Sequence, residues 1–238
     1  SDDYGELVIC CDNKNYWRKK KFPFYKAKRR EDQEKSELDW TAIYSYMNKI
    51  KQELKENLPY RVVEVDGVEA DDIIGTLVKI NSGFNPKKIL ILSRDKDFLQ
   101  LHKFNNVKQY DPIGDKYVTH PNPIECLKEH IIRGDRGDGI PNFLSPDNSF
   151  VSGIRQKSVT KKNLAVWLKQ DPSEFCDEKT IINYKRNESL IDLSKIPEDI
   201  HNSIITEYEN QQGKTRKNLM NYFMQTKLKN LMSSIGDF

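Results

Sequence analysis

The sequence predicts an α/β fold with a mainly parallel sheet and helices on both faces, because short apolar segments alternate with segments of helical periodicity. Residues 6–12, 61–65 and 87–92 are aliphatic or β-branched and are predicted strands. After Pro121 the strand-like segments give way to short helical patterns. We therefore expect an α/β domain at residues 1–121 and a smaller, mostly helical domain at residues 122–238.

The segments between the strands have their own signals. Apolar residues step by three and four from Leu38 until Pro59, which predicts an amphipathic helix there. A second helix is expected over 69–79 and a short one from Lys96. Residues 107–111 and 116–120, separated by a PIGD turn, predict a hairpin. The segment 13–36 is basic and has no clean helical period.

Composition excludes a membrane protein. Charged residues make up 32% of the 238 residues and the mean hydropathy is −0.77. The longest apolar segments, such as 89–92, fall far short of the ~20 residues of a membrane span. The four cysteines have no zinc-site spacing, which is typical of a reducing, cytoplasmic setting.

Two stretches of the chain carry positive charge without any acid. Residues 14–30 hold nine Lys or Arg together with five aromatic residues. Residues 148–170 hold a second group of five basic residues. Such segments are typical of proteins that bind a phosphate backbone, although a single charged run is as often a solvated face.

Carboxylates follow each of the three predicted strands. Six of them come at strand ends, and two more lie in the glycine-rich turn GDRGDGIPN: Asp12, Glu69, Asp71, Asp72, Asp95, Asp97, Asp135 and Asp138. In parallel sheets these ends meet at one edge, so the side chains are expected to converge. Carboxylates without a His or Cys cluster select hard cations, and two such ions can promote phosphodiester cleavage. Attraction of acids to a helix N-terminus would explain Glu69 and Asp71 alone, but not the whole set.

These motifs carry a family resemblance. In this order, GVEADD (67–72), SRDKDF (93–98) and GDRGDGIP (134–141) resemble the acidic motifs of the 5′-nuclease superfamily, which contains flap endonucleases and the 5′-nuclease domains of bacterial DNA polymerase I. The basic segment resembles the arch of that family, here residues 13–36. The end of the chain, YFMQTKLKNLMSSIGDF, resembles the branch of ribonucleases H from T-even-type bacteriophages. The resemblance covers almost the whole chain and implies a PIN-like or Rossmann-like sheet.

The resemblance also implies a two-metal site with Mg²⁺, for which Mn²⁺ substitutes. One ion would lie near Asp12, Glu69, Asp71, Asp95 and Asp97. The second would lie near Asp97, Asp135 and Asp138, with Asp72 in the surrounding shell. The four histidines are scattered singly and are expected to be ordinary surface or core residues, and no glycine-rich nucleotide loop is present.

In the arch, the resemblance places Lys26 beside the scissile phosphate and Arg29 on a backbone phosphate, as the catalytic cations. Trp17, Arg18 and Tyr25 are further candidates for nucleic-acid contact. Trp17 would either stack on a base or pack under the arch. GIRQKS (153–158) is similar to the second hairpin of a helix–three-turn–helix motif. Duplex DNA is expected to contact the helical domain there, through three basic residues: Arg155, Lys157 and Lys161.

The expected function is that of a divalent-metal-dependent 5′→3′ exonuclease and flap endonuclease with ribonuclease H activity. It would remove RNA primers and 5′ flaps during phage replication, in the cytoplasm of the infected host. Its partners would be a DNA duplex with a 5′ flap, an RNA–DNA hybrid, and a phage single-stranded-DNA-binding protein. The alternatives are a non-catalytic, structure-specific DNA-binding fragment of such a nuclease and a compact single-strand ribonuclease.

The sequence departs from the family pattern in two places. Gly139 follows Asp138 where the family usually has Asn. The strand with a metal-binding Asp that precedes the family's equivalent of residues 6–12 has no counterpart, so the catalytic domain is expected to be incomplete at its N-terminus. We expect that a separate N-terminal segment of several dozen residues complements the chain.

Overall fold

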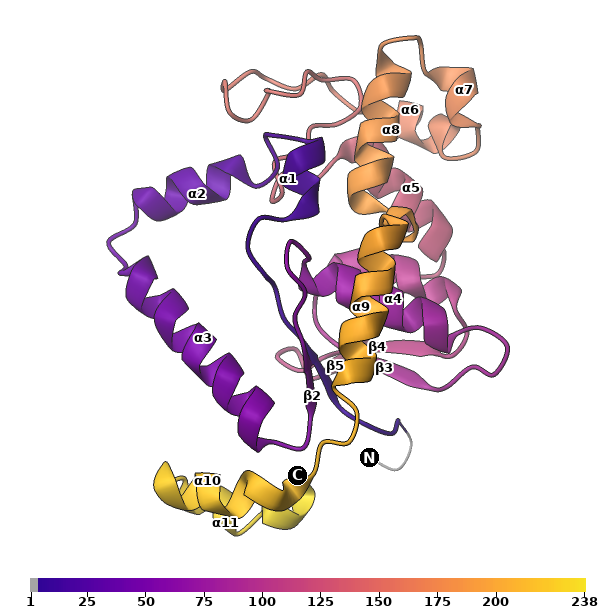
Figure 1. The fold of residues 1–238 in the computed structure, drawn as a ribbon. Coiled ribbons are helices and arrows are strands. Elements are labelled where there is room, and N and C mark those ends of the chain that lie inside the picture. The colour runs from indigo at the N-terminus through magenta and orange to yellow at the C-terminus, as the bar shows by residue number, and fades with distance from the viewer. Residues whose placement is uncertain (1–3) are drawn as a thin grey trace.

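The computed structural model describes residues 4–238 and has a mixed α/β architecture, as predicted (Figure 1). Two small sheets form in these residues. In one, β1 (Val8–Cys10) pairs in parallel with β2 (Arg61–Val63). In the other, β3 (Ile89–Leu92) pairs in parallel with β4 (Val107–Asp111), and β4 pairs antiparallel with β5 (Lys116–Val118) as the predicted hairpin.

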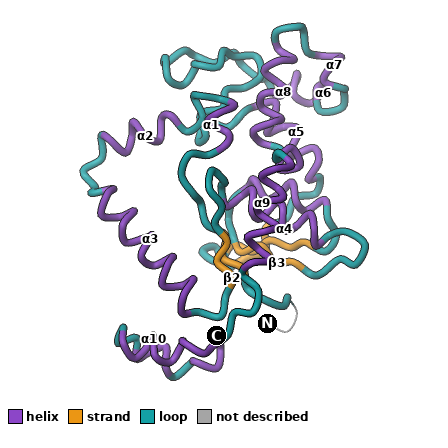
Figure 2. The backbone as a smooth tube through the Cα atoms, in the orientation of Figure 1, coloured by secondary structure: helices purple, strands orange, loops and turns teal. Residues whose placement is uncertain are grey.

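The single continuous sheet that we expected is therefore divided in the described part of the chain. Within residues 4–238, β1 pairs only with β2 and β3 pairs only with β4, so each of these strands has one edge without a strand partner. Figure 2 shows the strands gathered together, with helices around them. The expected N-terminal segment stays a prediction.

The helix predicted over 69–79 is α4 (Ala70–Asn81), and its first turn is fixed by a capping box. The Glu69 side chain accepts from the backbone of Asp72, and the Asp72 side chain accepts from the backbone N–H of Glu69. Two residues of the acidic motif thus satisfy the free N–H groups of the helix terminus. Asp71 lies between them in sequence and makes neither bond of the box.

The helix predicted from Leu38 is α3 (Trp40–Asn57), but its apolar face is not buried as an amphipathic helix would suggest. Met47 is 58% exposed and Ile50 is 56% exposed. At its C-terminal end, Leu54 and the following Leu58 join a cluster with two residues of the C-terminal segment, Leu219 and Phe223. α3 stands away from the sheets for most of its length (Figure 1).

The basic arch, for which no helical period was found, contains two short helices. These are α1 (Trp17–Lys21) and α2 (Ala27–Glu34). Pro23 lies between them, and Lys26 has a left-handed backbone with φ 53°, which turns the chain before α2. Together, α2 and α3 form two arms joined at their far end (Figure 1).

Beyond Pro121 the described chain is helical, as predicted. The α-helices are α5 (Pro123–Arg133), α6 (Lys161–Trp167), α7 (Pro172–Phe175), α8 (Thr180–Ile191), α9 (Glu198–Asn210), α10 (Leu219–Gln225) and α11 (Lys229–Met232). The 3-10 helices of this part are η2 (Leu193–Lys195), η3 (Arg216–Asn218) and η4 (Ile235–Asp237), and another, η1 (Lys96–Lys103), lies before Pro121. The segment predicted to carry the helix–three-turn–helix motif lies between α5 and α6 as a series of turns.

The helical segment packs directly on the α/β segment. Ile204 of α9 is fully buried in a cluster with Val63 and Ile73. Leu193 lies so close to Gly75 of α4 that a Cβ there would come within 3.1 Å of the leucine Cβ. The boundary predicted near Pro121 remains a prediction, and side chains from both sides of it share one core.

Candidate metal centre and nucleic-acid interface

Carboxylates from three parts of the chain meet at one small cavity. Asp71 comes from the first turn of α4, Asp97 from the first turn of η1, and Asp135 and Asp138 from the turn after α5. All four line the cavity, together with Tyr25 of the arch. One carboxylate from each of the two motifs that follow predicted strands, and both carboxylates of the glycine-rich turn, therefore lie together at this cavity.

Burial and neighbouring charges shift the pKa values of Asp71 and Asp97 upward. Burial, with the charges of Asp97 and Asp95, raises the pKa of Asp71 to about 8. Burial also raises the pKa of Asp97 to about 6, with Asp95, Asp135 and Asp138 acting in the same direction and His130 opposing. Buried carboxylates that lie this close together are stabilised by a cation between them or by protonation. The oxygen-rich donor set suits a hard divalent ion.

The glycine-rich turn after α5 positions the last two carboxylates. Gly134 has φ 67°, and a Cβ on it would lie 2.3 Å from the carbonyl oxygen of Ile140, so only glycine fits. The turn closes through the backbone N–H of Ile140, which donates to the carbonyl of Asp135 (2.7 Å). Asp135 Oδ1 then accepts from the backbone N–H of Asp138 (2.9 Å).

Asp12 and Asp95 lie at the edge of this group and are exposed. Asp12 Oδ1 accepts from the backbone N–H of Ala70 (2.7 Å), at the start of α4. Asp95 caps η1, where its Oδ1 accepts from the backbone N–H of Asp97 (3.0 Å). The described structure gives both side chains a backbone partner and does not place them in the cavity lining.

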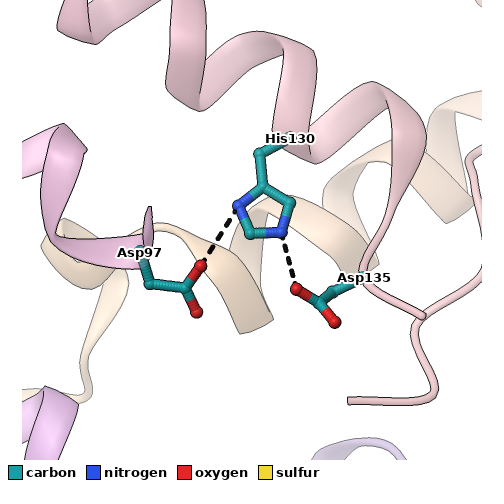
Figure 3. A group of neighbouring side chains, drawn as sticks. All are labelled: Asp97, His130 and Asp135. Atoms are coloured by element: carbon teal, nitrogen blue, oxygen red, sulfur yellow. Dashed lines mark hydrogen bonds and ion pairs between the residues drawn. The ribbon is translucent and has the colours of Figure 1, made fainter. Parts of the chain in front are cut away.

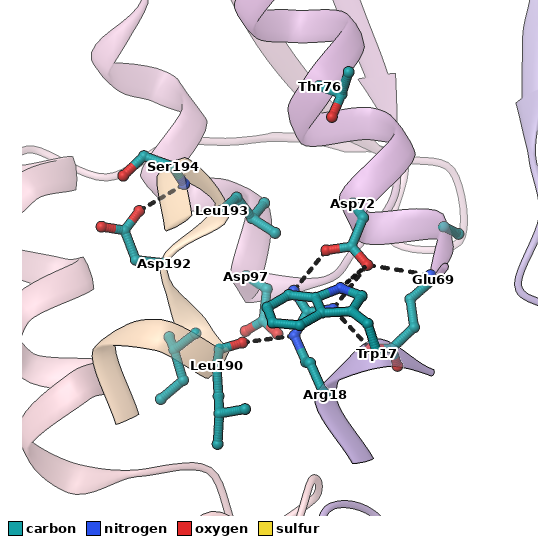
Figure 4. Close-up of polar contacts among 12 residues, drawn as sticks. Trp17, Arg18, Glu69, Asp72, Thr76, Asp97, Leu190, Asp192, Leu193 and Ser194 are labelled. Carbon is teal, nitrogen blue, oxygen red and sulfur yellow. Dashed lines mark hydrogen bonds and ion pairs between the residues drawn. The ribbon is translucent and has the colours of Figure 1, made fainter. Parts of the chain in front are cut away.

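Trp17 and Arg18, predicted to contact nucleic acid, are instead interior residues with 8% and 3% exposure (Figure 4). The Arg18 guanidinium donates to both oxygens of Asp72 (2.7 and 2.8 Å) and to Glu69 (2.8 Å). Its Nε donates to the carbonyl of Leu190 in α8 (2.8 Å). Trp17 Nε1 donates to Asp72 (2.9 Å). A buried carboxylate such as Asp72 is costly unless it accepts hydrogen bonds, and Arg18 and Trp17 donate them. Both side chains therefore face the interior and not the solvent.

Tyr25 is also buried, at 3% exposure, and links the arch to the carboxylates. Its hydroxyl lies 3.0 Å from Glu69 Oε2 and 2.9 Å from Asp138 Oδ2, so its single proton is shared between the two carboxylates. Burial, with the charges of Asp138 and Glu69, raises the pKa of this phenol. Tyr25 therefore holds the base of the arch against the carboxylates, toward which its polar atom points.

Lys26 and Arg29 also lie beside Asp138. Lys26 Nζ lies 2.5 Å from Glu69 Oε1 and 3.7 Å from Asp138 Oδ1. Burial alone would lower the pKa of Lys26, but the charges of Asp138 and Glu69 outweigh it and raise that pKa. Arg29 donates to Asp138 (2.7 Å) and to the carbonyl of Gly137 (3.0 Å), and it remains 56% exposed.

One residue of the centre was missed in the sequence. His130, expected to be an ordinary histidine, lies on α5 between two of the carboxylates (Figure 3). Its Nε2 lies 2.9 Å from Asp135 Oδ2, and its Nδ1 lies 3.6 Å from Asp97 Oδ1. Burial would lower the pKa of His130, but the hydrogen bond to Asp135 and the nearby carboxylates raise it. The five-residue spacing to Asp135 in sequence carries no recognisable signal.

The three basic residues predicted to contact duplex DNA are exposed: Arg155, Lys157 and Lys161. The loop that carries Lys157 is fixed by its backbone. The N–H of Lys157 donates to Ser145 Oγ (2.9 Å), and its carbonyl accepts from the Asn142 side chain (2.8 Å). The lysine side chain is thereby presented to solvent on an ordered backbone.

Comparison with protein families matches both segments of the chain. Residues 1–129 match the 5′-3′ exonuclease, N-terminal resolvase-like domain. Residues 121–238 match the C-terminal domain of T4 RNase H. The chain belongs to the 5′-3′ exonuclease family. This confirms the superfamily predicted from the acidic motifs, and with it the enzyme class of nuclease.

Two sequence relatives support the assignment of the chain to this 5′-3′ exonuclease family. The chain is 35% identical to Ribonuclease H of Enterobacteria phage T4 over 99% of its own length and 80% of that protein. It is 26% identical to the 5′-3′ exonuclease of Buchnera aphidicola, over 79% of the chain and 69% of that protein. The predicted branch of phage ribonucleases H is confirmed by the first of these.

Solved structures share the fold of the chain. The T5 D15 protein co-crystallised with metal ions matches with a TM-score of 0.60 at 16% identity, over 87% of this chain and 86% of that one. The T5 D15 flap endonuclease in a pseudo-enzyme-product complex with DNA and metal ions matches with a TM-score of 0.60 at 14% identity, over 87% and 84%. Within residues 4–238, no helix combines the length and apolarity needed to cross a membrane.

Proposed function

We propose that this family member is a divalent-metal-dependent 5′-3′ nuclease that hydrolyses phosphodiesters with Mg²⁺. The observation that carries the proposal is that Asp71, Asp97 and Asp138 line one cavity, and that the arch cations Lys26 and Arg29 are paired with Asp138 beside it. Carboxylates alone would suit a storage site for a cation. Adjacent phosphate-binding cations make the same place suitable for a phosphodiester.

The residues fit a pair of hard cations. Asp71, Asp97 and Asp138 would hold ions at the cavity, with Glu69 beside them and Asp12 and Asp95 at the exposed edge. Divalent ions there supply an activated water and stabilise the leaving oxygen. Asp72, which is fully buried and bound by Arg18, stays behind the ligands and fixes α4.

The protein's own cations position the substrate. Lys26 is placed to contact the scissile phosphate, because its ammonium lies beside the carboxylates of Glu69 and Asp138. The exposed Arg29 fork suits bidentate binding of a backbone phosphate. Tyr25 holds this arch segment in place through Glu69 and Asp138. Arg155, Lys157 and Lys161 add phosphate contacts outside the cavity, which supply affinity rather than chemistry.

The proposed substrates are DNA duplexes with a 5′ flap and RNA–DNA hybrids, and the proposed role is removal of RNA primers and flaps in phage replication in the host cytoplasm. A phage single-stranded-DNA-binding protein is the proposed protein partner. Two features support these substrates: the long basic arch, and the second basic surface at Arg155, Lys157 and Lys161. A compact single-strand ribonuclease has no need of that second surface.

The test is a cleavage assay on 5′-labelled substrates: a 5′ flap, an RNA–DNA hybrid and single-stranded RNA. Each is incubated with Mg²⁺, with Mn²⁺ or with EDTA. We expect metal-dependent cleavage of the first two and weak cleavage of the third. Tight binding of the flap without cleavage under every condition would favour the non-catalytic DNA-binding fragment, and preferred cleavage of single-stranded RNA would favour the ribonuclease.

A further inference from the structure

We propose that His130 is a metal ligand together with Asp97, and that this imidazole shifts one of the two metal positions toward transition-metal ions such as Mn²⁺ or Zn²⁺. The inference rests on the proposed function, which places divalent ions at the same cavity. It goes beyond that function because it assigns a nitrogen ligand and a metal class to one position.

The separation of His130 and Asp97 is that of an ion pair when the imidazole is protonated, and it also suits two ligands of one metal ion when the imidazole is neutral. His130 Nδ1 lies 3.6 Å from Asp97 Oδ1, beyond the distance of a good N–H···O bond. Two ligands at about 2.1 Å from one tetrahedral ion lie about 3.4 Å apart. The two atoms are therefore separated by nearly the spacing that a shared ion imposes, and both residues line the cavity.

Asp135 holds the imidazole in the orientation that a ligand needs. Its Oδ2 lies 2.9 Å from His130 Nε2, and its Oδ1 accepts from the backbone N–H of Asp138. Metal-binding histidines commonly donate their second ring N–H to a carboxylate in this way. With Nε2 carrying the proton, the Nδ1 lone pair of neutral His130 faces Asp97. Asp135 thereby orients His130, and its predicted role as a direct ligand stays a prediction.

The position of the three side chains supports a single site. One ligand atom from each of Asp97, His130 and Asp135 lies within 4.8 Å of the others (Figure 3). The three come from η1, from α5 and from the turn that Gly134 permits, so separate elements fix each one. His130 lies on a helix, and a helix fixes the position of a side chain more tightly than a loop does.

The chemistry follows from the nitrogen donor. Carboxylates and water suit Mg²⁺, whereas imidazole favours the transition metals, in the order that rises from Mn²⁺ toward Cu²⁺. Adding one imidazole to Asp97 therefore favours Mn²⁺ and Zn²⁺ relative to Mg²⁺. The remaining oxygen ligands, such as Asp71, keep the position usable by Mg²⁺.

The experiment uses Mn²⁺ as the probe and pulsed electron paramagnetic resonance as the readout, with the full chain. A histidine nitrogen bound to Mn²⁺ gives a ¹⁴N modulation that carboxylates cannot give. We expect this modulation in the wild type, its loss in His130→Gln, and its persistence in His120→Gln. His120 is the matched control because it is a histidine outside the cavity that contacts the backbone of Asn122.

Metal titration by calorimetry gives the second measurement. We expect His130→Gln to weaken Mn²⁺ binding by about 10-fold or more, the range seen when metal-site residues are lost, and to weaken Mg²⁺ binding less. A wild type without ¹⁴N modulation would overturn the inference, and so would a His130→Gln variant that retains it. The wild-type measurement does not depend on the variant, so it tests the inference even if the variant folds poorly. Wild-type cleavage of a 5′ flap with Mg²⁺ tests the proposed function separately, and a complete lack of Mn²⁺ binding would count against both.

Discussion

Lys26 of the arch and Glu69 at the start of α4 form a direct ion pair, with Nζ 2.5 Å from Oε1 and side chains that are only 14% and 3% exposed. The pair joins a segment that stands away from the body of the protein to a carboxylate in its interior. A cation in this position balances the acidic centre. When divalent ions provide that balance, the ammonium becomes available to a phosphate.

Lys26→Ala should lower turnover far more than affinity. A charge beside the reacting phosphate stabilises the transition state most, and loss of one such contact costs on the order of 10²–10³ in rate. Single-turnover cleavage rates and the Kd for a 5′ flap in Ca²⁺ separate the two effects. Lys28→Ala is the matched control, because Lys28 is an exposed lysine two residues away. Equal losses of rate and affinity in Lys26→Ala would contradict the assignment.

Lys157→Ala should show the opposite pattern. Its exposed side chain lies in the segment between α5 and α6 and does not line the cavity. Removing one phosphate contact should weaken duplex binding and reduce the slope of log K against log[salt] by about 0.9, while turnover at saturating substrate stays unchanged. Fluorescence anisotropy at several salt concentrations measures the slope. An unchanged slope would remove Lys157 from the duplex-binding surface.

Asp95→Asn combined with Asp97→Asn should abolish cleavage and leave DNA binding largely intact. Asn is a neutral, weaker metal ligand, and burial, which with neighbouring carboxylates raises the pKa of Asp97 to about 6, would no longer act on a charged group there. Cleavage and anisotropy assays on the same flap provide the measurement. The paired change Asp32→Asn with Glu31→Gln, on α2, controls for loss of two acidic charges at the surface. Full cleavage by the double variant would refute the site.

Arg18→Met should destabilise the protein strongly. The fully buried Asp72 would lose its bidentate partner, and an uncompensated buried charge costs about 3–5 kcal/mol. Urea unfolding followed by circular dichroism gives the free energy of unfolding. Lys20→Met, an exposed position on the same helix, should change it by less than about 0.5 kcal/mol. Similar values for the two variants would mean that Asp72 is solvated or protonated.

Metal-free protein should lose stability as the pH rises from about 4 to about 8. The folded pKa of Asp71 is raised to about 8 and that of Asp97 to about 6, from an ordinary 3.8. A group with a raised folded pKa contributes stability that is present below its unfolded pKa and is lost as pH passes the folded pKa. Mg²⁺ binds the ionised form, so the increase in Tm on adding Mg²⁺ should grow over the same window. Melting curves in EDTA that are flat from pH 4 to 8 would contradict this.

Local sequence signals determined most of the elements and most of the acidic residues of the site. The helical period and the carboxylates at 69–72 predicted α4 and its first turn, because capping and periodicity are properties of neighbouring residues. The strands at 61–65 and 87–92 and the hairpin were found for the same reason. The carboxylates could be assigned to one edge because the ends of parallel strands meet there.

The tertiary structure alone decided which residues face one another. Arg18 was predicted to face nucleic acid, yet it binds Asp72 and the carbonyl of Leu190, a residue 172 positions away. His130 and Asp97 are distant in sequence, and no local pattern brings them together. A charged side chain has no periodic signal of its own. Whether it is solvated, paired or available to a metal depends on the elements packed around it, and that packing is set by the whole chain.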